Sequence, residues 1–573
     1  MFGKIKCTIG NNVAEYLEKS ITILKNEKRR TNNIFYCRNG VYNMNDFNTL
    51  GVMIDCSRNA VMKASEVKKF ALNLSKMGYN ALLLYTEDTY EIKDEPFFGH
   101  LRGRYTHEEL ADIDSYCKSL GIEVIPCIQT LAHLNCMFKW ESVYDGIRDI
   151  DDVLLIDEEN TYKLIEKMFA QISRTFSSKR IHIGMDEAFS VGLGKHLALH
   201  GYEERYNLIV RHLDRVCKIA AKYGLETMIW SDMFVKLGLS VGDYYAIDGE
   251  KAKKPDADIP KNVSLVYWDY YSDDYDHYMQ LIKVNKMFGR NVVFAGGVWT
   301  WRGFAPDNAF SLKVAAPAIR ACRDSQVKDV IFTMWGDDGG ECPKNAVLPS
   351  LFYISQLSKG NENMEDIKKK FLDMFGFPFD SMLLLDGLDT PGDIKNDNPS
   401  KYMLYNDPFT GLNDHHCSSE HRAYYRELTK KLKNAECSDE YRYLFDSGEK
   451  LSAVLEYKCD LGLRTRNLYQ SCDKEGLKKL INEDYPLVID RLKEFYNAFK
   501  VQWFKENNPH GFDIQDIRIG GLLMRLESCK DRLGLYLDGK IDSIPELEEK
   551  TLNGEVDKHW ARCVSPNVIS HIV

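Results

Sequence analysis

The chain has 573 residues, of which 44% are hydrophobic and 28% are charged, and its formal net charge at pH 7 is −10. This length predicts two or three domains, one of them large enough to be a barrel of about 250 residues. Acidic and basic side chains are interspersed, and no apolar run reaches the roughly 18 residues that a membrane-spanning helix needs. We therefore expect a soluble protein that binds neither nucleic acid nor a membrane.

Cysteine usage and the first residues of the chain bear on the cellular compartment. The 15 cysteines form an odd number without paired spacing, and several lie in apolar runs, as reduced buried thiols do. Residues 1–20 lack the unbroken apolar stretch and the small-residue cleavage site of a secretory signal. No Cys or His cluster has the spacing of a zinc site. These observations predict a cytoplasmic protein without a bound metal.

In chain order, residues 1–50 are expected to form a short α/β appendage, with a helix near 12–27 and a strand near 33–37. From residue 51 onwards, short β-rich apolar runs alternate with amphipathic stretches, which indicates repeated βα units around a parallel sheet. The eight runs are residues 52–55, 81–86, 123–128, 180–185, 226–230, 264–268, 291–295 and 329–334. The candidate helices lie near 65–77, 107–119, 159–175, 203–222, 274–287, 308–323 and 346–357. This pattern predicts an α/β protein with a (β/α)8 TIM barrel over residues 51–358.

Beyond the barrel the pattern changes to long, charged, amphipathic helices, which predicts a separate α-helical C-terminal domain over residues 359–573. The longest candidate helices lie near 420–434, 439–458, 475–500 and 514–535. Segment 388–418 is rich in Asp, Asn, Pro and Gly and is expected to be a loop. The segment NNPHGFDIQDIRIGG (507–521) is motif-like. It is either an ordinary interhelical loop or a segment that approaches the mouth of the barrel.

Polar and aromatic side chains follow nearly every run, at the position where TIM barrels build their active sites. In chain order these residues are Asp55, Arg58, Glu87, Asp88, Gln129, His133, Asp186, Glu187, Trp230, Asp232, Trp268, Asp269, Tyr270, Trp299, Trp301, Trp335 and Asp337. The sequence thus predicts that one mouth of the barrel is lined by carboxylates, one arginine, one histidine and several tryptophans.

The adjacent carboxylates in RIHIGMDEAFSVGLG (180–194) are the centre of the functional prediction. Glycosidic cleavage needs a protonated carboxyl group at the leaving oxygen and a nucleophile on the anomeric carbon. Adjacent residues cannot flank a sugar in these two roles, which favours Glu187 as the acid and Asp186 on another part of the same sugar. The alternative, an acidic N-terminus that only stabilises a helix, is disfavoured by the other polar strand ends.

With these motifs, residues 50–355 resemble the family 20 glycoside hydrolases, the β-N-acetylhexosaminidases, whose signature is His/Gly-x-Asp-Glu after the fourth strand. In that family the substrate's acetamido oxygen attacks its own anomeric carbon to form an oxazolinium intermediate. The resemblance implies that Glu187 is the general acid/base, that Asp186 orients the acetamido group and that Arg58 binds ring hydroxyls of the terminal sugar. The helical tail resembles that of a bacterial subgroup of exo-acting N-acetylglucosaminidases.

Further roles follow from the same resemblance. His133 and the acidic pair Glu87 and Asp88 match a relay that supports Glu187, and which of the two carboxylates faces inward is left open. Asp337 matches an acidic residue that holds distal hydroxyls, and Tyr270, with Tyr267 as second choice, matches the tyrosine on the acetamido oxygen. The aromatic residues expected to wall the sugar are Trp230, Trp268, Trp301 and Trp335. The chain departs from the family pattern in its short N-terminal appendage and in GGVWTWRGF (296–304).

The resemblance therefore implies an exo-acting retaining β-N-acetylhexosaminidase that uses no metal and no organic cofactor and acts on glycans ending in a β-linked N-acetylhexosamine. Two other readings are an O-GlcNAc hydrolase type of barrel, which would carry paired aspartates, and a non-catalytic glycan-binding barrel, which would lack the acid. Preference for GlcNAc or GalNAc, the linkage and assembly as a homodimer are left open.

Overall fold

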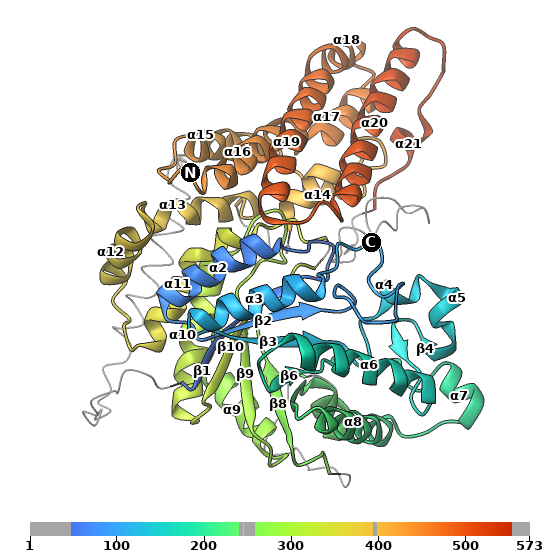
Figure 1. The fold of residues 1–573 in the computed structure, drawn as a ribbon. Helices are drawn as coiled ribbons and strands as arrows, with labels where there is room; N and C mark the ends of the chain where they lie inside the picture. Colours follow the sequence, from blue (N-terminus) through green and yellow to red (C-terminus); the bar gives the residue numbers. More distant parts are fainter. Residues whose placement is uncertain (1–46, 240–243, 246–257, 338, 393–397, 553–573) are drawn as a thin grey trace, which may run out of the picture.

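The computed structural model describes residues 47–239, 244–245, 258–337, 339–392 and 398–552. The helix and strand predicted within residues 1–46 lie outside this range. Within it, no helix is long and apolar enough to cross a membrane. Figure 1 shows a barrel in blue to yellow, with the C-terminal helices in orange and red stacked on one side of it.

Eight parallel strands close into the predicted barrel, in the order β1-β10-β9-β8-β7-β6-β3-β2. Their bounds are β1 (Thr49–Asp55), β2 (Ala81–Thr86), β3 (Glu123–Ile128), β6 (Arg180–His182), β7 (Glu226–Trp230), β8 (Val263–Trp268), β9 (Val292–Gly297) and β10 (Asp329–Met334). Each overlaps one predicted run, which confirms the TIM barrel. β6 ends three residues before its run does, because the chain turns away from the ladder there.

Two hydrophobic layers explain why these runs form strands. Met53, Leu83 and Val266 point into the barrel and belong to an inner cluster, whereas the flanking Val52 and Ile54 pack outwards against helices. Strands buried on both faces read as continuous apolar runs, as these do. The covering helices are α2 (Ala64–Met77), α3 (His107–Ser119), α6 (Glu159–Thr175), α8 (Arg205–Lys222), α9 (Tyr275–Lys286), α10 (Asn308–Asp324) and α11 (Leu348–Ser358).

Several short elements of the barrel were not predicted, because each is too short to carry a periodic pattern. After β3 come α4 (Asn135–Phe138), α5 (Glu141–Tyr144), the 3-10 turn η1 (Asp145–Ile147) and an antiparallel pair of strands, β4 (Arg148–Ile150) and β5 (Val153–Leu154). After β6 comes α7 (Lys195–His200), and after β7 comes a π-helical turn, η2 (Phe234–Gly238). A 3-10 turn, η3 (Lys344–Val347), precedes α11.

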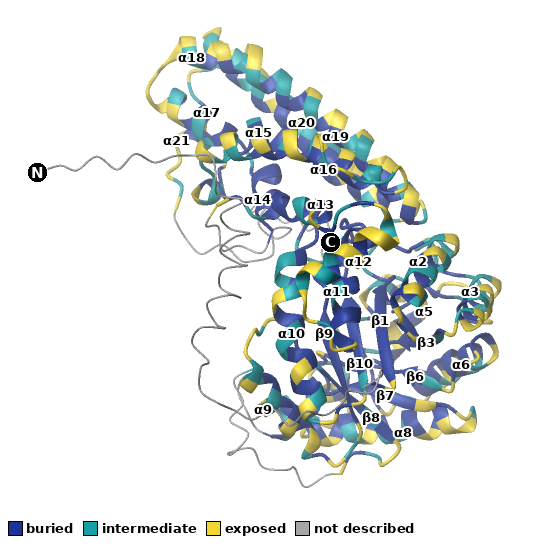
Figure 2. Cartoon of the chain, turned by 90° about the vertical axis from the view of Figure 1, so that its left-hand side faces the viewer, coloured by how far each residue is buried: buried dark blue, intermediate teal, exposed yellow. Residues whose placement is uncertain are grey.

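The C-terminal region is helical, as expected. Its first part contains α12 (Met364–Phe375), α13 (Phe379–Leu383), η4 (Leu384–Asp389), α14 (Pro399–Tyr405) and η5 (Asp414–His416). Its second part contains α15 (Glu420–Lys433), α16 (Arg442–Lys458), α17 (Leu461–Gln470), α18 (Lys474–Lys479), the π-turn η6 (Leu480–Asp484), α19 (Tyr485–Glu506), α20 (Phe512–Leu537) and α21 (Pro545–Glu548). Figure 2 shows these helices as a layer with buried residues towards the barrel side.

One prediction for this region was wrong. Segment 388–418 is not one loop, since it contains α14, which begins with Pro399 at a position where a missing backbone N–H costs nothing. The helix expected over 475–500 is confirmed, because α18, η6 and α19 follow one another without a break. The π-helical turn η6 is a local irregularity of this helix, and Pro486 lies in the first turn of α19, which follows it directly.

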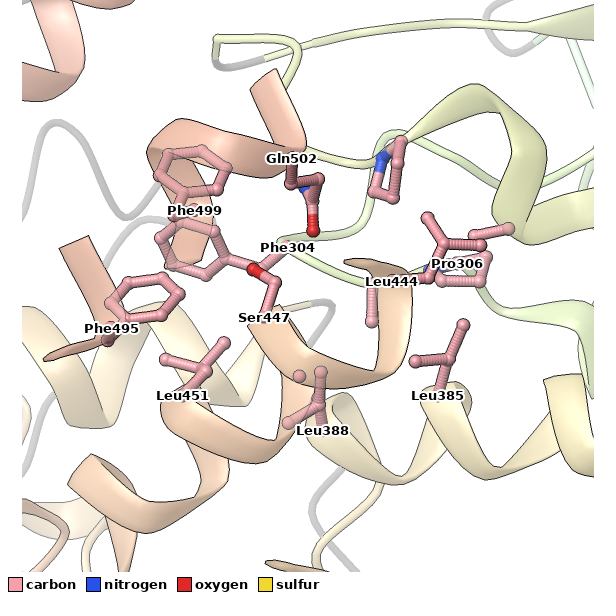
Figure 3. Close-up of a pocket in the computed structure, with 14 residues that line it drawn as sticks. Phe304, Pro306, Leu385, Leu388, Leu444, Ser447, Leu451, Phe495, Phe499 and Gln502 are labelled. Atoms are coloured by element: carbon pink, nitrogen blue, oxygen red, sulfur yellow. The ribbon is translucent and has the colours of Figure 1, made fainter. Parts of the chain in front are cut away.

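A small pocket marks where the barrel meets the helical domain (Figure 3). Phe304 and Pro306 from the loop after β9 face Leu444 and Leu451 of α16, and Phe499 of α19 lies beside them. Most of its lining is apolar, and it shares no residue with the strand-end set described above. We interpret it as a packing gap at the seam between the two parts of the chain.

This gap predicts that Gly448→Ala stabilises the protein. Gly448 lines the pocket from α16, and a Cβ atom there would lie 3.4 Å from Leu385 and 3.4 Å from Leu388, which is ordinary van der Waals contact. Alanine in place of a helical glycine contributes about 0.5–1 kcal/mol, so the melting temperature should rise by about 1–3 °C.

Gly476→Ala is the matched control. It is also helical, but its Cβ would lie 2.5 Å from Leu468 and 2.6 Å from Asp473, so no stabilisation is expected. Equal melting temperatures for Gly448→Ala and the wild type would contradict the packing argument.

Candidate active site

The turn after β6 has an unusual backbone conformation. Gly184, Met185 and Glu187 have positive φ angles of 72°, 70° and 51°. A Cβ atom on Gly184 would lie 2.0 Å from Oε1 of Gln129, so only glycine fits there. Such conformations cost about 1–3 kcal/mol for other residues and persist where the surroundings enforce them. The turn places Asp186 and Glu187 at the carboxyl end of the barrel.

Asp186 is held on both of its oxygens. Nε2 of Gln129 donates to Oδ1 at 2.8 Å, while Oε1 of the same amide accepts the N–H of Met185 at 3.0 Å. Nε2 of His133 lies 3.2 Å from Oδ2, in an ion pair whose geometry falls short of a well-aligned hydrogen bond. These contacts fix the direction of a carboxylate whose side chain is only 10% exposed.

His133 lies between the two carboxylates, with Nε2 3.8 Å from Oε2 of Glu187. Its own backbone has a φ of 58°, and its N–H donates to Oδ2 of Asp152 at 3.0 Å. Burial alone would lower the pKa of His133, but the Asp186 carboxylate raises it to about 9. Burial alone would raise the pKa of Asp186, but the same pairing outweighs burial and lowers this pKa to about 2. At neutral pH the two side chains form an imidazolium and a carboxylate.

Glu187 differs from its neighbour in exposure and charge state. Its side chain is 46% exposed, and burial together with the Asp186 charge raises the pKa of Glu187. Asp232, which follows β7, accepts the N–H of Glu187 at 3.0 Å and is fully buried. Burial and the Asp186 charge also raise the pKa of Asp232 to about 7. One carboxylate of the adjacent pair is thus held ionised, while the other retains a proton more readily.

Arg58 lies across the mouth from this turn, where β1, β2 and β10 end. The carboxylate oxygens around its guanidinium belong to Asp55 at 3.2 Å, Glu87 at 3.5 Å and Asp337 at 4.0 Å. The group also lies over the rings of Tyr85 and Trp335, 4.8 and 4.7 Å from their centroids. Asp55 is fully buried and orients Arg58, whereas Asp337 is 49% exposed. The exposed donors of Arg58 and the Asp337 carboxylate are positioned to bind a hydroxylated ligand.

The structure separates the roles of Glu87 and Asp88. Glu87 faces Arg58, and burial raises the pKa of its carboxyl against the effect of that cation. Asp88 turns away and pairs with Arg102 at 3.2 Å, while Arg102 donates to the carbonyl of Ser57 at 2.5 Å. Of the two carboxylates, Glu87 is therefore the one that lies at the mouth beside Arg58, because alternating residues after a strand point in opposite directions. Asp88 instead supports the loop that carries Arg58.

The predicted tryptophans line the mouth as a set. Trp230 and Trp335 belong to the inner barrel cluster, with ring centroids 6.0 Å apart. Trp268 and Trp301 pack on the edge of that cluster, each against Tyr270, at 5.2 and 5.5 Å. Large flat side chains of this kind suit the apolar face of a sugar ring.

The choice between two tyrosines is decided by the direction of their side chains. Tyr270 is in the inner cluster with the tryptophans. Tyr267 packs outwards, and its hydroxyl donates to Oδ2 of Asp269 at 2.8 Å. The same oxygen lies 2.6 Å from Nε2 of His277. Tyr270 therefore faces the mouth, and Tyr267 and Asp269 lie behind it.

The sequence assigns no role to Asp55, Gln129 or Asp232, whose only signal is their position after a strand. Asp152 lies in the turn between β4 and β5, two strands that were not predicted, so nothing in the sequence points to its bond with His133. Within the described part of the chain, no group of three or more His, Cys, Asp or Glu side chains is arranged to hold a metal ion.

A closed parallel barrel with an oriented carboxyl pair, a cation and an aromatic wall at the carboxyl ends of its strands has the architecture of a glycoside hydrolase. Residues 47–282 match the glycosyl hydrolase family 20 catalytic domain, and residues 380–563 match the glycoside hydrolase 20C C-terminal domain. The chain belongs to glycoside hydrolase family 20.

Characterised relatives are distant. The chain is 25% identical over 211 residues to hexosaminidase D of Bos taurus, covering 34% of this chain and 56% of that protein. It is 25% identical over 211 residues to beta-hexosaminidase 3 of Arabidopsis thaliana, covering 34% and 38%. A GH20 exo-β-N-acetylglucosaminidase of Vibrio harveyi, solved in complex with N-acetylglucosamine, is similar with a TM-score of 0.45 and 16% identity over 59% of this chain and 58% of that one. The chain thus matches about half or less of the length of its curated relatives.

The pairing of His133 with Asp186 predicts a pH-dependent contribution to stability. The pKa of His133 is about 9 in the folded protein against about 6.5 when unfolded, so the contribution is complete below pH 6.5 and is lost as the pH rises through 9. His133→Asn should lower the free energy of unfolding by about 1–3 kcal/mol at pH 6, and the difference should shrink by pH 10. Urea unfolding of both proteins across this range measures it.

His200→Asn, at the exposed end of α7, serves as the control and should behave as the wild type at every pH. A constant difference between wild type and His133→Asn from pH 6 to pH 10 would mean that the side chain contributes packing rather than charge.

Proposed function

We propose that the chain is an exo-acting retaining β-N-acetylhexosaminidase in which the substrate's acetamido group is the nucleophile. The observation that carries this proposal is the division of labour within the turn after β6. Asp186 is buried, oriented and ionised, whereas Glu187 is half exposed with a raised pKa. A general acid and a charge-stabilising carboxylate need these two different environments.

In the first step, the carboxyl group of Glu187 donates its proton to the glycosidic oxygen as the bond to the anomeric carbon breaks. The acetamido oxygen forms a new bond to that carbon and gives an oxazolinium ring. Asp186 accepts a hydrogen bond from the acetamido N–H and offsets the positive charge that develops on this nitrogen. His133 and Gln129 hold the carboxylate in place, so little reorganisation is needed at the moment of reaction.

In the second step, Glu187, now a carboxylate, accepts a proton from water, and the water oxygen attacks the anomeric carbon from the face that the leaving group vacated. The oxazolinium ring opens and restores the acetamido group. Two inversions give a product with the original β configuration.

The carboxylates around the turn support the use of a substrate nucleophile. Asp232 is fully buried behind Glu187 and accepts its backbone N–H, and Glu87 is turned towards Arg58. A retaining mechanism with a protein nucleophile needs a second carboxylate about 5 Å from the acid, on the opposite side of the sugar. Among the described residues we assign no side chain to that position.

The wall opposite the turn supports recognition of a chain end. Arg58 and Asp337 present donors and an acceptor that suit the ring hydroxyls of a terminal sugar, and the tryptophans suit its apolar face. Both GlcNAc and GalNAc fit this chemistry, so we propose terminal β-linked N-acetylhexosamines on glycans as the substrate class.

Removal of the acid tests the first assignment. Glu187→Gln should lower kcat/KM on natural glycans by about 10²- to 10⁴-fold, because the amide has no proton to deliver. An aryl glycoside with a good leaving group needs less assistance and should lose much less in its first step. Glu226→Gln, an exposed carboxylate at the opposite end of the barrel, is the control. Wild-type rates of Glu187→Gln on both substrates would exclude Glu187 as the acid.

The acetamido group itself tests the mechanism. An aryl glycoside with hydroxyl in place of the acetamido group should lose most of its turnover, because the nucleophile has been removed. Asp186→Asn should lower kcat for the N-acetyl substrate by about 10²-fold or more, since the developing charge loses its counter-charge. NMR of the early product should show the β anomer. An early α anomer, or a glycosyl adduct on a carboxylate, would contradict substrate assistance.

A further inference from the structure

A buried charge cluster joins the helical domain to the loop that carries Asp337. Glu341 lies four residues further along this loop, with its side chain 1% exposed. One of its oxygens lies 2.8 Å from Nζ of Lys401, and the other lies 2.7 Å from Nη1 of Arg518 and 3.2 Å from Nε2 of Gln515. Lys401 belongs to α14, and Gln515 and Arg518 belong to α20. Two helices of the C-terminal domain thus hold one carboxylate of the barrel.

The neighbouring turn between α19 and α20 holds the loop that carries Arg58. Asn59 follows Arg58 with a φ of 77°, and its Nδ2 donates to the carbonyl of Gly511 at 2.7 Å. The N–H of Asn508 donates to the carbonyl of Val61 at 2.8 Å. Gly511 has a φ of 88°, and a Cβ atom there would lie 2.3 Å from the carbonyl oxygen of Asn59, so the approach requires glycine. The segment 507–521 is therefore an interhelical loop with the start of α20, and it also contacts the loop that carries Arg58.

One of these contacts holds the loop that carries Asp337, and the other holds the loop that carries Arg58. Nε of Arg58 lies 4.0 Å from Oδ1 of Asp337, and their loops are linked directly where Oδ2 of Asp55 accepts the N–H of Gly336 at 2.9 Å. Glu506, at the end of α19, also accepts the N–H of Lys344 at 2.6 Å. The helical domain therefore contacts both loops, whereas Gln129 and Asp232, which hold the turn after β6, belong to the barrel.

The free energy needed to bury the ions around Glu341 indicates that this cluster does more than stabilise the fold. Removing ions from water costs several kcal/mol each, and buried ion clusters are often no more stabilising than apolar packing of the same volume. The side chains of Lys401 and Arg518 are 1% and 4% exposed, so both cations are almost completely removed from water. Directional contacts of this kind fix geometry, and a displacement of about 1 Å in a binding group can lower the rate about 10²-fold.

We propose that the helical domain is part of the sugar-binding site: through Glu341 and the turn at Gly511 it sets the positions of Asp337 and Arg58. Arg518 is a positioning residue for recognition of the terminal sugar's ring hydroxyls. This proposal rests on the proposed function for what Arg58 and Asp337 bind, and it assigns the domain a role in specificity rather than in the chemical step.

The test uses the full chain and compares Arg518→Met, Arg518→Lys and Arg525→Met. Arg525 lies on the same helix, and its Nε is 2.5 Å from Oδ2 of Asp407 within the helical domain, so Arg525→Met is a control for the loss of an ion pair on α20. Each variant is assayed on an aryl N-acetyl-β-glucosaminide and on its 4-deoxy analogue. The ratio of the two kcat/KM values measures discrimination at a ring hydroxyl.

Arg518→Met should raise KM and lower kcat/KM on the intact sugar by about tenfold or more, with a much smaller loss on the 4-deoxy sugar, so the ratio falls. Arg518→Lys should restore part of the ratio, and Arg525→Met should leave it unchanged. A general loss of folded protein lowers both activities equally. An unchanged ratio in Arg518→Met would overturn the proposal.

Amide hydrogen exchange separates this proposal from the proposed function. Arg518→Met should increase exchange in residues 57–62, 336–337 and 339–341, and Arg525→Met should not. If neither aryl substrate is turned over by the wild type, the proposed function fails, while the exchange result still decides whether the helical domain positions the two loops. Unchanged exchange in Arg518→Met would exclude that coupling.

Discussion

The contact between His133 and Asp186 organises the chemistry of the site. It joins a cation from the loop after β3 to a carboxylate from the turn after β6, and it holds both in the charged form at neutral pH. Burial and this fixed negative neighbour together raise the pKa of Glu187, one residue away. The different states of Asp186 and Glu187 are thus produced by their surroundings and not by their residue types.

The backbone of the turn makes this contact possible. On an extended strand Asp186 and Glu187 would point to opposite faces, one of them into a helix layer. The left-handed conformations at Gly184, Met185 and Glu187 take the chain out of the ladder and bring both side chains to the mouth. Gln129 accepts the backbone N–H of Met185, and Asp232 accepts that of Glu187, so side chains that also lie against the carboxylates hold the strained turn.

The loops on the opposite side of the mouth are held in place by a different part of the chain. Arg58 and Asp337 lie on loops of the barrel, but contacts to these loops come from α14, α19 and α20. In the proposed function, the barrel supplies Asp186 and Glu187 from the end of its own strand, and the helical domain contacts the loops that carry Arg58 and Asp337. Because the helical domain holds these loops, a change in that domain can alter their positions while the turn after β6 stays the same.

The sequence by itself determined the eight strands, most of the helices and the set of residues at the mouth, because strand burial and helical periodicity are local patterns and barrel sites lie at strand ends. It did not determine which of Glu87 and Asp88 faces inward, which of Tyr267 and Tyr270 reaches the mouth, or where β6 ends. These depend on the exact residue at which a strand stops, and one residue reverses a side chain's direction. Only the tertiary structure decided that Arg518 meets Glu341, since these residues are 177 positions apart and charge pairing over that distance leaves no local signal.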